Sequence, residues 1–196
     1  MTTRLLIAKA LAATVVGAAF LSQQYYPEDS AIEFSLEASG MVLLGAAALG
    51  RVWSAVFVSG RKSQELITDG PYSMTRNPLY FFSFLGFLGA GLMFQSFIIT
   101  AALAAVFFLT HWPTILKEEI KLRGIFGERY DDYCMSVPRF FPRPWLYSSR
   151  ATAEFCPRVF TKAVFESMLM LSVIPLADGL EHLRTSAHMP SLFIMY

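Results

Sequence analysis

Charged residues are scarce in this 196-residue sequence, where Asp, Glu, Lys and Arg together make up 16% of the chain. Ordinary soluble proteins contain about 25% of these four residues. Hydrophobic residues account for 55% of the chain, which argues against an ordinary soluble fold. The formal net charge is only +1. A nucleic-acid-binding protein requires a strong basic excess, so the sequence also argues against that role.

Residues that build metal sites and disulfide frameworks are also few. The two cysteines, Cys134 and Cys156, cannot form a framework of bridges and lack the spacing of metal ligands. His111, His182 and His188 form no cluster with ligand spacing. No GxGxxG motif follows a candidate strand, so a soluble dinucleotide-binding fold has no support. The sequence therefore predicts no metal site.

Long apolar segments occur instead, at residues 5–22, 36–58, 79–94 and 97–116, with a weaker one at 159–177. A transmembrane helix needs about 20 apolar residues, so we predict an all-α integral membrane bundle of four to five transmembrane helices. The first segment has the positive start of a signal peptide, but the lack of a small-x-small cleavage site favours a membrane helix. The last segment can span the membrane, lie in its interface or pack on the bundle.

A tight helical hairpin is predicted in the middle of the chain. Residues 77–116 contain no Asp, Glu, Lys or Arg, and one helix of that length would far exceed the hydrocarbon core of about 30 Å. The segment must therefore fold back, and the polar pair Gln95-Ser96 is the expected turn. Several glycines allow close helix packing. They are Gly40, Gly45, Gly50, Gly86, Gly89 and Gly91.

We expect one integral membrane domain, 1–196, made of two N-terminal helices (1–59), a core that carries the motifs (60–147) and a C-terminal extension (148–196). Basic residues flank the predicted helices on one side, namely Arg4, Lys9, Arg61, Lys62, Arg76 and those after Lys117. The loop at 28–33 contains only acids. By the positive-inside rule the basic side is cytoplasmic. The hairpin therefore brings 70–80 and 117–143 together on the cytoplasmic face.

Arg51 falls inside the second predicted helix. An arginine at mid-bilayer costs about 2.5–3.5 kcal/mol on insertion scales. It should therefore face the bundle or an aqueous cavity, or else lie near the interface, where it can pair or snorkel.

Residues 70–80, GPYSMTRNPLY, form the candidate ligand site. Gly70 and Pro71 favour a turn, while Pro78 keeps Asn77 out of the helical region and can open the next helix. Hydrogen-bonding side chains lie between the prolines, namely Tyr72, Ser73, Thr75, Arg76 and Asn77. At membrane depth, polar irregular backbone is tolerated only where it is buried in protein or lines a cavity.

Glu118 and Glu119 follow the second arm of the hairpin. Carboxylates suit a cationic ligand, because they accept hydrogen bonds from ammonium groups and ribose hydroxyls. The alternative is ordinary pairing within a helix, Glu118 with Lys121 and Glu119 with Arg123. The aromatic run at 80–87 is expected to pack or to face lipid rather than to stack on a base.

These motifs resemble the isoprenylcysteine carboxyl methyltransferase family and its bacterial relatives. GPYSMTRNPLY, a hydrophobic hairpin, KEE and FGERYDDYCMSVPRFFP follow one another in this chain. The family pattern has GPY, an arginine-histidine-proline-x-tyrosine box, a Glu-Glu pair, FG-x-x-Y and VPR-F-x-P in the same order. The resemblance covers about residues 64–142. It implies an integral membrane enzyme that uses S-adenosylmethionine and releases S-adenosylhomocysteine.

The resemblance also implies the site residues. For cofactor binding these are Gln64, Glu65, Leu66, Ile67, Tyr72, Asn77, Pro78, Leu79, Tyr80 and Glu119. For catalysis they are Arg76, Glu118, Glu119 and Arg139, with either glutamate as the acidic cofactor contact. Asn77 departs from the pattern, since the eukaryotic enzymes have a histidine there and asparagine cannot become cationic. Residues 112–115 also lack the arginine that holds the substrate carboxylate in those enzymes.

We therefore predict a methyltransferase that moves a methyl group from S-adenosylmethionine to a small or lipid-like acceptor. The acceptor group is a carboxylate, thiol, amine or hydroxyl, and the partners are this acceptor and the lipid bilayer. The site is expected to face the cytoplasm, in the inner membrane of a bacterium. Two alternatives stay open, an NADPH-dependent membrane reductase of the sterol-reductase type and a non-enzymatic helical bundle in which the polar motif is only a folded loop.

Overall fold

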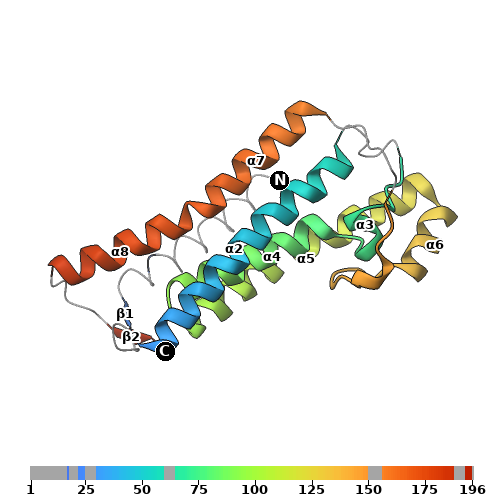
Figure 1. The fold of residues 1–196 in the computed structure, drawn as a ribbon. Helices are drawn as coiled ribbons and strands as arrows, with labels where there is room; N and C mark the ends of the chain where they lie inside the picture. Colours follow the sequence, from blue (N-terminus) through green and yellow to red (C-terminus); the bar gives the residue numbers. More distant parts are fainter. Residues whose placement is uncertain are drawn as a thin grey trace. The chain divides into compact units, whose positions relative to one another are not determined.

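The computed structural model describes residues 30–59, 65–149 and 156–187, together with Gly17 and the strand residues 22–24 and 193–195. Its elements are β1 Ser22–Gln24, α2 Ala31–Val58, α3 Pro71–Met74, α4 Pro78–Met93, α5 Phe97–Phe126, α6 Glu128–Ser136, η1 Pro144–Leu146, α7 Pro157–Leu171, α8 Val173–Ala187 and β2 Phe193–Met195. All of them except η1 are labelled in Figure 1. The strands β1 and β2 pair in parallel. The prediction of a first helix at 5–22 falls almost wholly outside the described residues.

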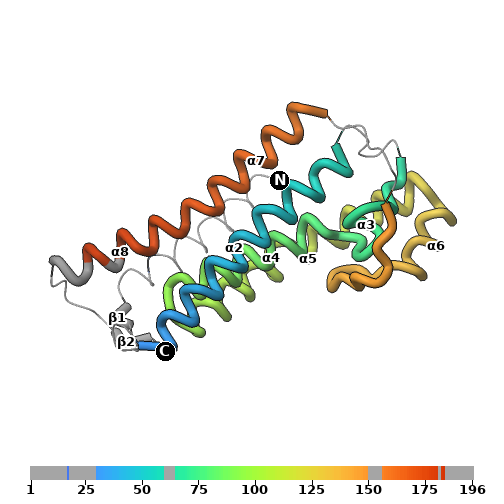
Figure 2. Tube along the Cα trace, in the orientation of Figure 1, coloured from blue at the N-terminus to red at the C-terminus, as the bar shows by residue number. Residues whose placement is uncertain are grey.

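Three helical segments of the described chain are long and apolar enough to cross a membrane, namely Ala31–Val58, Phe97–Phe126 and Pro157–Leu180. The helix α4 is apolar but has only 16 residues. These segments, which can be followed in Figure 2, confirm the predicted all-α membrane bundle. The C-terminal segment is thus long enough to span, which was one of its three expected placements.

The chain forms two compact units. Unit 1 takes its described residues from Met1–Gly45, Phe84–Thr110 and Leu169–Tyr196. Unit 2 takes them from Ala46–Ser83 and His111–Met168. In unit 1, Leu44, Met93 and Ala177 form one buried cluster. In unit 2, Tyr130 and Tyr133 of α6 pack with Val137 in a second buried cluster.

The helix α2 begins at Ala31, five residues before the predicted start at 36. Ser30 explains the difference, because its hydroxyl accepts a hydrogen bond of 3.1 Å from the backbone N–H of Glu33. A serine followed three residues later by glutamate is the pattern of a capping box. Glu33 is buried, although it was expected in a polar loop.

The predicted hairpin is confirmed, because α4 ends at Met93 and α5 begins at Phe97. Gln95 in the turn has a positive φ of 53°, and Ser96 starts α5 by accepting a bond of 3.3 Å from the N–H of Ile99. Beyond the predicted end of the second arm at 116, α5 continues as one helix to Phe126. The added segment is rich in Lys, Glu, Leu and Arg, which are good helix formers.

Two predicted glycines bring α2 and α4 into contact within unit 1. A Cβ atom on Gly89 would lie 2.9 Å from the Gly40 carbonyl oxygen and 3.0 Å from the Leu44 nitrogen. These are backbone atoms, which cannot move aside as a flexible side chain does. By contrast, a Cβ on Gly45 would meet nothing within 4 Å. The glycines thus differ in role although the sequence pattern treats them alike.

We expect Gly89→Ala to lower the free energy of unfolding by about 1–2 kcal/mol, because overpacking forces the helices apart. Gly45→Ala is the matched control and should raise it by up to about 1 kcal/mol, since alanine favours a helix. Denaturant titration in detergent, followed by circular dichroism, measures both changes. Equal effects of the two substitutions would contradict the close contact between α2 and α4.

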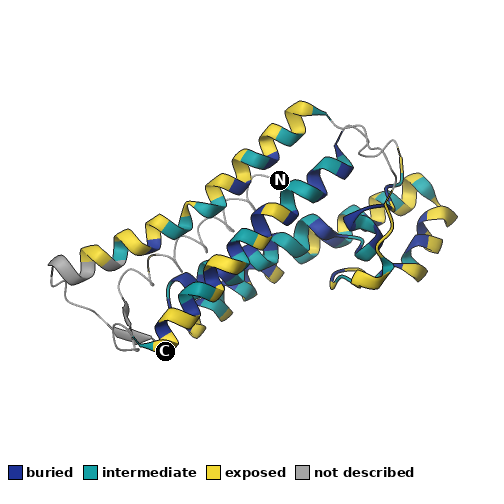
Figure 3. Cartoon of the chain, viewed as in Figure 1, coloured by how far each residue is buried: buried dark blue, intermediate teal, exposed yellow. Residues whose placement is uncertain are grey.

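Arg51 in unit 2 is paired, as one of its two expected placements requires. Its guanidinium donates to the Ser83 hydroxyl and to the Glu166 carboxylate, the latter at 2.9 Å. Three further hydrogen bonds join α7 and the residue before it to α2 and the residue after it. Ser167 donates to the Ala48 carbonyl at 3.2 Å, and Ser59 exchanges two hydrogen bonds with the backbone of Cys156. Figure 3 shows α7 with many exposed residues, in yellow.

Candidate functional site

The loop before α4 folds as its glycine and prolines predict. Gly70 adopts a positive φ of 59°, and Pro71 opens the short helix α3. A Cβ on Gly70 would collide with the Phe57 ring, so both backbone conformation and space favour glycine here. Pro78 is the first residue of α4, where its missing N–H costs nothing.

Residues 138–148, here called the strap, are hydrogen-bonded along this loop through backbone groups. The backbone N–H of Arg76 donates to the Pro138 carbonyl at 2.9 Å, and the backbone N–H of Arg143 donates to the Met74 carbonyl at 2.9 Å. The N–H of Gly70 donates to the Ser148 carbonyl at 2.7 Å. These bonds satisfy polar backbone that would otherwise be costly to bury.

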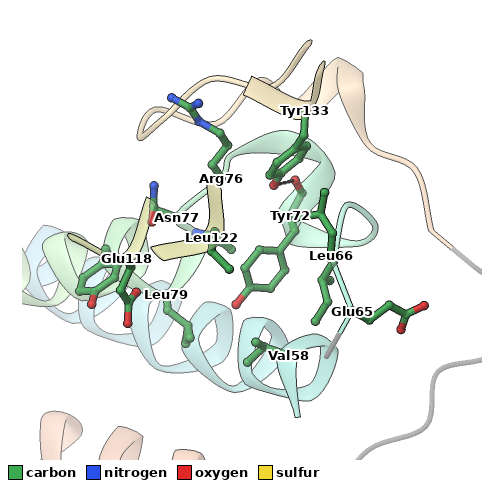
Figure 4. A pocket seen from close by; sticks show the side chains of 13 residues that line it. Val58, Glu65, Leu66, Tyr72, Arg76, Asn77, Leu79, Glu118, Leu122 and Tyr133 are labelled. Carbon is green, nitrogen blue, oxygen red and sulfur yellow. Dashed lines mark hydrogen bonds between the residues drawn. The ribbon is translucent and has the colours of Figure 1, made fainter. Parts of the chain in front are cut away.

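Two side chains reinforce this attachment. Thr75 is buried and donates its hydroxyl to the Phe140 carbonyl of the strap at 3.0 Å. Tyr133 of α6 donates its hydroxyl to the Tyr72 carbonyl at 2.6 Å, the bond drawn in Figure 4. The sequence motif at 70–80 is therefore held in place by residues about 60 positions later in the chain.

Glu119 lies at the centre of a buried polar cluster. Its carboxylate accepts hydrogen bonds from the Asn77 amide at 3.1 Å and from Arg139 Nε at 2.9 Å. The Nε of Arg76 lies 3.5 Å from the same carboxylate. Asn77 also donates to the Arg139 carbonyl at 3.0 Å. One acid thus joins α5, the loop and the strap.

The expectation that Glu119 pairs with Arg123 within its helix is wrong. Arg123 binds Asp131 of α6 instead, at 2.6 Å. The guanidinium of Arg139 also lies over the Trp112 ring, 5.9 Å from its centroid, which adds a cation–π contact to the ion pair. Contacts that the fold creates therefore replace the local i,i+4 pair.

A cavity opens beside this cluster and has an empty volume of about 690 Å³, part of which is open to solvent. We call it the apolar cavity. It is lined by Val58, Glu65, Leu66, Ile67, Tyr72, Arg76, Asn77, Pro78, Leu79, Tyr80, Glu118, Leu122 and Tyr133. Figure 4 shows the Tyr72 ring across its middle, whereas the guanidinium of Arg76 and the carboxylate of Glu65 point away from that ring.

The polar side chains around the apolar cavity are two carboxylates, one guanidinium, one amide and three tyrosine hydroxyls, set among aliphatic walls. Burial raises the pKa of the Tyr72 hydroxyl above its ordinary value of 10.0, and the nearby Glu118 and Tyr80 raise it further. Burial is also the main cause of the raised pKa of Tyr133. Both tyrosines are therefore neutral hydrogen-bond donors at physiological pH, and Glu118 supplies the acceptor.

Most of the predicted site residues line this one cavity. They are Glu65, Leu66, Ile67, Tyr72, Arg76, Asn77, Pro78, Leu79, Tyr80 and Glu118. Glu119 and Arg139 belong to the buried cluster and are not among the lining residues. Gln64 lies outside the described residues. Of the two glutamates that the sequence left as alternatives, only Glu118 is part of the cavity wall.

Three lining residues were not predicted, namely Val58, Leu122 and Tyr133. Leu122 follows Glu118 by four positions on the same helix, so helical spacing could have indicated it. No comparable signal marks Tyr133, because α6 reaches the cavity only after the chain turns at Gly127. The aromatic run packs as expected, with Phe84 and Phe87 against Phe107, and only Tyr80 reaches the cavity.

The phospholipid methyltransferase family matches residues 32–129. The chain is 34% identical over 168 residues to the nickel-cobalt-cadmium resistance protein NccN of Alcaligenes xylosoxydans xylosoxydans, covering 86% of this chain and 78% of that protein. It is 36% identical over 142 residues to the cobalt-zinc-cadmium resistance protein CzcN of Cupriavidus metallidurans, covering 72% and 65%.

A protein-S-isoprenylcysteine O-methyltransferase of Schizosaccharomyces pombe is 32% identical over 94 residues, covering 47% of this chain and 40% of that protein. No solved structure matches the chain. The family match at 32–129 begins earlier than the resemblance seen in the sequence and includes nearly all of α2. It ends before Tyr133 and the strap.

Proposed function

Because the chain belongs to the phospholipid methyltransferase family, we propose that it is a membrane methyltransferase that uses S-adenosylmethionine. The observation that carries this proposal is the apolar cavity, where Glu118 and the hydroxyls of Tyr72 and Tyr80 meet aliphatic walls.

The donor set suits this cofactor. A carboxylate such as that of Glu118 accepts hydrogen bonds from ribose hydroxyls and offsets the positive charge of a sulfonium. The aliphatic walls, among them Leu66, Leu79 and Leu122, offer apolar surface to a purine ring. Neutral tyrosine hydroxyls add donors without adding charge. The resemblance assigns most of these residues to the cofactor site, and the structure places them around one cavity.

When bound, S-adenosylmethionine supplies an activated methyl group on a sulfonium centre. The residues of this chain then contribute chiefly by positioning and by excluding water, because an in-line displacement needs little covalent help. Glu118 and Tyr80 would orient the nucleoside from α5 and α4. The cluster around Glu119 would hold the loop and the strap rigid, so that the cavity keeps its shape.

We propose that the acceptor is small or lipid-like and approaches the cavity from the bilayer between apolar helices. The cavity wall includes residues of α2, α4 and α5, each of which is apolar over most of its length. The cofactor would enter from water on the opposite side. The cytoplasmic orientation remains a prediction from the distribution of basic residues, and the bacterial inner membrane remains a prediction that goes with the family resemblance.

NccN and CzcN are named for resistance to metals. We propose that a corresponding role of this chain would work through methylation of an acceptor. Its site would then be the same apolar cavity.

Cofactor binding tests the proposed function directly. The detergent-solubilised chain should bind S-adenosylhomocysteine in isothermal titration calorimetry and should be stabilised thermally by it. NADPH should produce neither effect, because the described cavity is lined by carboxylates and offers no cluster of cations for its phosphates. Stabilisation by NADPH alone would favour the reductase, and binding of neither cofactor would favour the non-enzymatic bundle.

A further inference from the structure

A second cavity lies next to the apolar cavity and shares three lining residues with it. We call it the polar cavity, and it has an empty volume of about 1170 Å³ that includes open solvent. Its lining consists of Glu65, Leu66, Thr68, Ser73, Arg129, Asp132, Tyr133, Ser136, Val137, Leu146 and Ser148. The shared residues are Glu65, Leu66 and Tyr133. The two cavities therefore adjoin each other at these residues.

The lining of the polar cavity differs in chemistry from that of the apolar cavity. It combines one guanidinium, from Arg129, with two carboxylates, from Asp132 and Glu65. Five residues with hydroxyls complete the polar lining, namely Thr68, Ser73, Tyr133, Ser136 and Ser148. Arg129 and Asp132 are three positions apart on α6, and this spacing places them next to each other on the surface of the helix.

The charged groups of Arg129 and Asp132 are not held by other side chains of the described residues. No described side chain makes a hydrogen bond or ion pair with the Arg129 guanidinium or the Asp132 carboxylate, and the backbone carbonyl of Asp132 accepts a bond from Ser136. Their neighbours behave differently, because Asp131 binds Arg123 at 2.6 Å outside both cavities. One arginine–aspartate pair is thus satisfied internally, and the other faces a cavity.

We propose that the polar cavity receives the α-amino and α-carboxylate groups of S-adenosylmethionine, while the apolar cavity holds its nucleoside and sulfonium. This inference rests on the proposed function. A zwitterion needs a cation and an anion side by side, which Arg129 and Asp132 provide. A guanidinium binds a carboxylate through two parallel hydrogen bonds, and a carboxylate accepts from an ammonium group.

The division between the cavities follows from the cost of burying charge. The amino-acid end carries two full charges that are expensive to remove from water, whereas the purine is largely apolar. The polar cavity is open and rich in hydroxyls, so the charged end keeps much of its hydration there. The reacting sulfonium would lie on the shielded side, where excluded water favours transfer to the acceptor.

The test compares two ligands on the full-length chain in detergent. S-Adenosylhomocysteine carries the amino-acid end, whereas 5′-methylthioadenosine lacks it but keeps the nucleoside and the sulfur. Isothermal titration calorimetry should show that Arg129→Gln and Asp132→Asn each weaken S-adenosylhomocysteine binding about tenfold, as expected for a lost charged hydrogen bond. The same substitutions should leave the affinity for 5′-methylthioadenosine unchanged. Arg129→Lys should fall between Arg129→Gln and the wild type.

Arg123→Gln and Asp131→Asn are the matched controls, because they remove the same charges outside the cavities. They should change neither affinity. Equal affinity of the wild type for both ligands, or an equal loss for both ligands in the Arg129 and Asp132 variants, would overturn this inference while leaving the proposed function intact. If the wild type binds neither ligand, the proposed function fails, and this inference fails with it. Circular dichroism confirms folding of each variant, and both positions are exposed in the structure.

Discussion

Replacing Glu119 by alanine is expected to lower the free energy of unfolding by about 3 kcal/mol. Removing one partner of a buried ion pair leaves the other charge uncompensated, which typically costs about 3–5 kcal/mol. Here the carboxylate faces two guanidinium groups, and the side chain of Arg76 is 10% exposed whereas that of Arg139 is 42% exposed. We take the lower end of the range because solvent screens Arg139.

Denaturant titration of the purified chain in detergent measures this loss. Glu128→Ala is the matched control, because Glu128 is an exposed glutamate at the start of α6, and it should change stability by less than about 0.5 kcal/mol. Arg139→Gln should cost less than Glu119→Ala. The strap should also become more sensitive to protease in Glu119→Ala, since its ion pair to α5 is lost. An unfolding energy equal to that of the wild type would show that the cluster contributes nothing to the fold.

Replacing Glu118 by glutamine should weaken S-adenosylhomocysteine binding about thirtyfold without unfolding the protein. A hydrogen bond to a charged acceptor contributes about 1.5–3 kcal/mol, and about 2 kcal/mol corresponds to this factor in Kd. Glutamine keeps the shape of the side chain but removes the charge. Isothermal titration calorimetry gives the affinity, and a thermal unfolding curve reports whether the cavity is intact.

A pair of controls separates the two adjacent glutamates. Glu128→Gln removes a carboxylate outside the cavity and should bind S-adenosylhomocysteine as the wild type does. Glu119→Gln should affect stability more than the affinity measured for the folded fraction. If Glu118→Gln binds normally and folded Glu119→Gln does not, then Glu119 is the cofactor contact, contrary to our assignment.

The hairpin was predictable because the bilayer limits the length of an uncharged helix. The segment 77–116 had to turn, and Gln95-Ser96 was its only break in hydrophobicity at a suitable place, as α4 and α5 confirm. The break between α5 and α6 is also a local feature, because Gly127 has a positive φ of 55°. The earlier start of α2 could also have been predicted, because Ser30 and Glu33 have the spacing of a capping box. The polar residues of the segment instead favoured a loop.

The partners of the charged residues were not predictable in the same way. Local spacing favoured Arg123 for Glu119, whereas the observed partner in the strap, Arg139, is 20 positions away. Pairing was one of the alternatives expected for Arg51, but its partner Glu166 is 115 positions away. Many arginine–glutamate combinations are compatible with one sequence, and only the packing of the helices decides which two approach.

The sequence by itself determined the class of protein, the hairpin and the set of residues that gather at its polar end, because these depend on hydrophobic length and on local backbone chemistry. Tertiary structure alone decided that Glu118 faces the apolar cavity while Glu119 joins the buried cluster. Neighbouring positions on a helix differ by about 100° in direction. What surrounds that helix, here the loop and the strap, therefore assigns opposite roles to two identical adjacent residues.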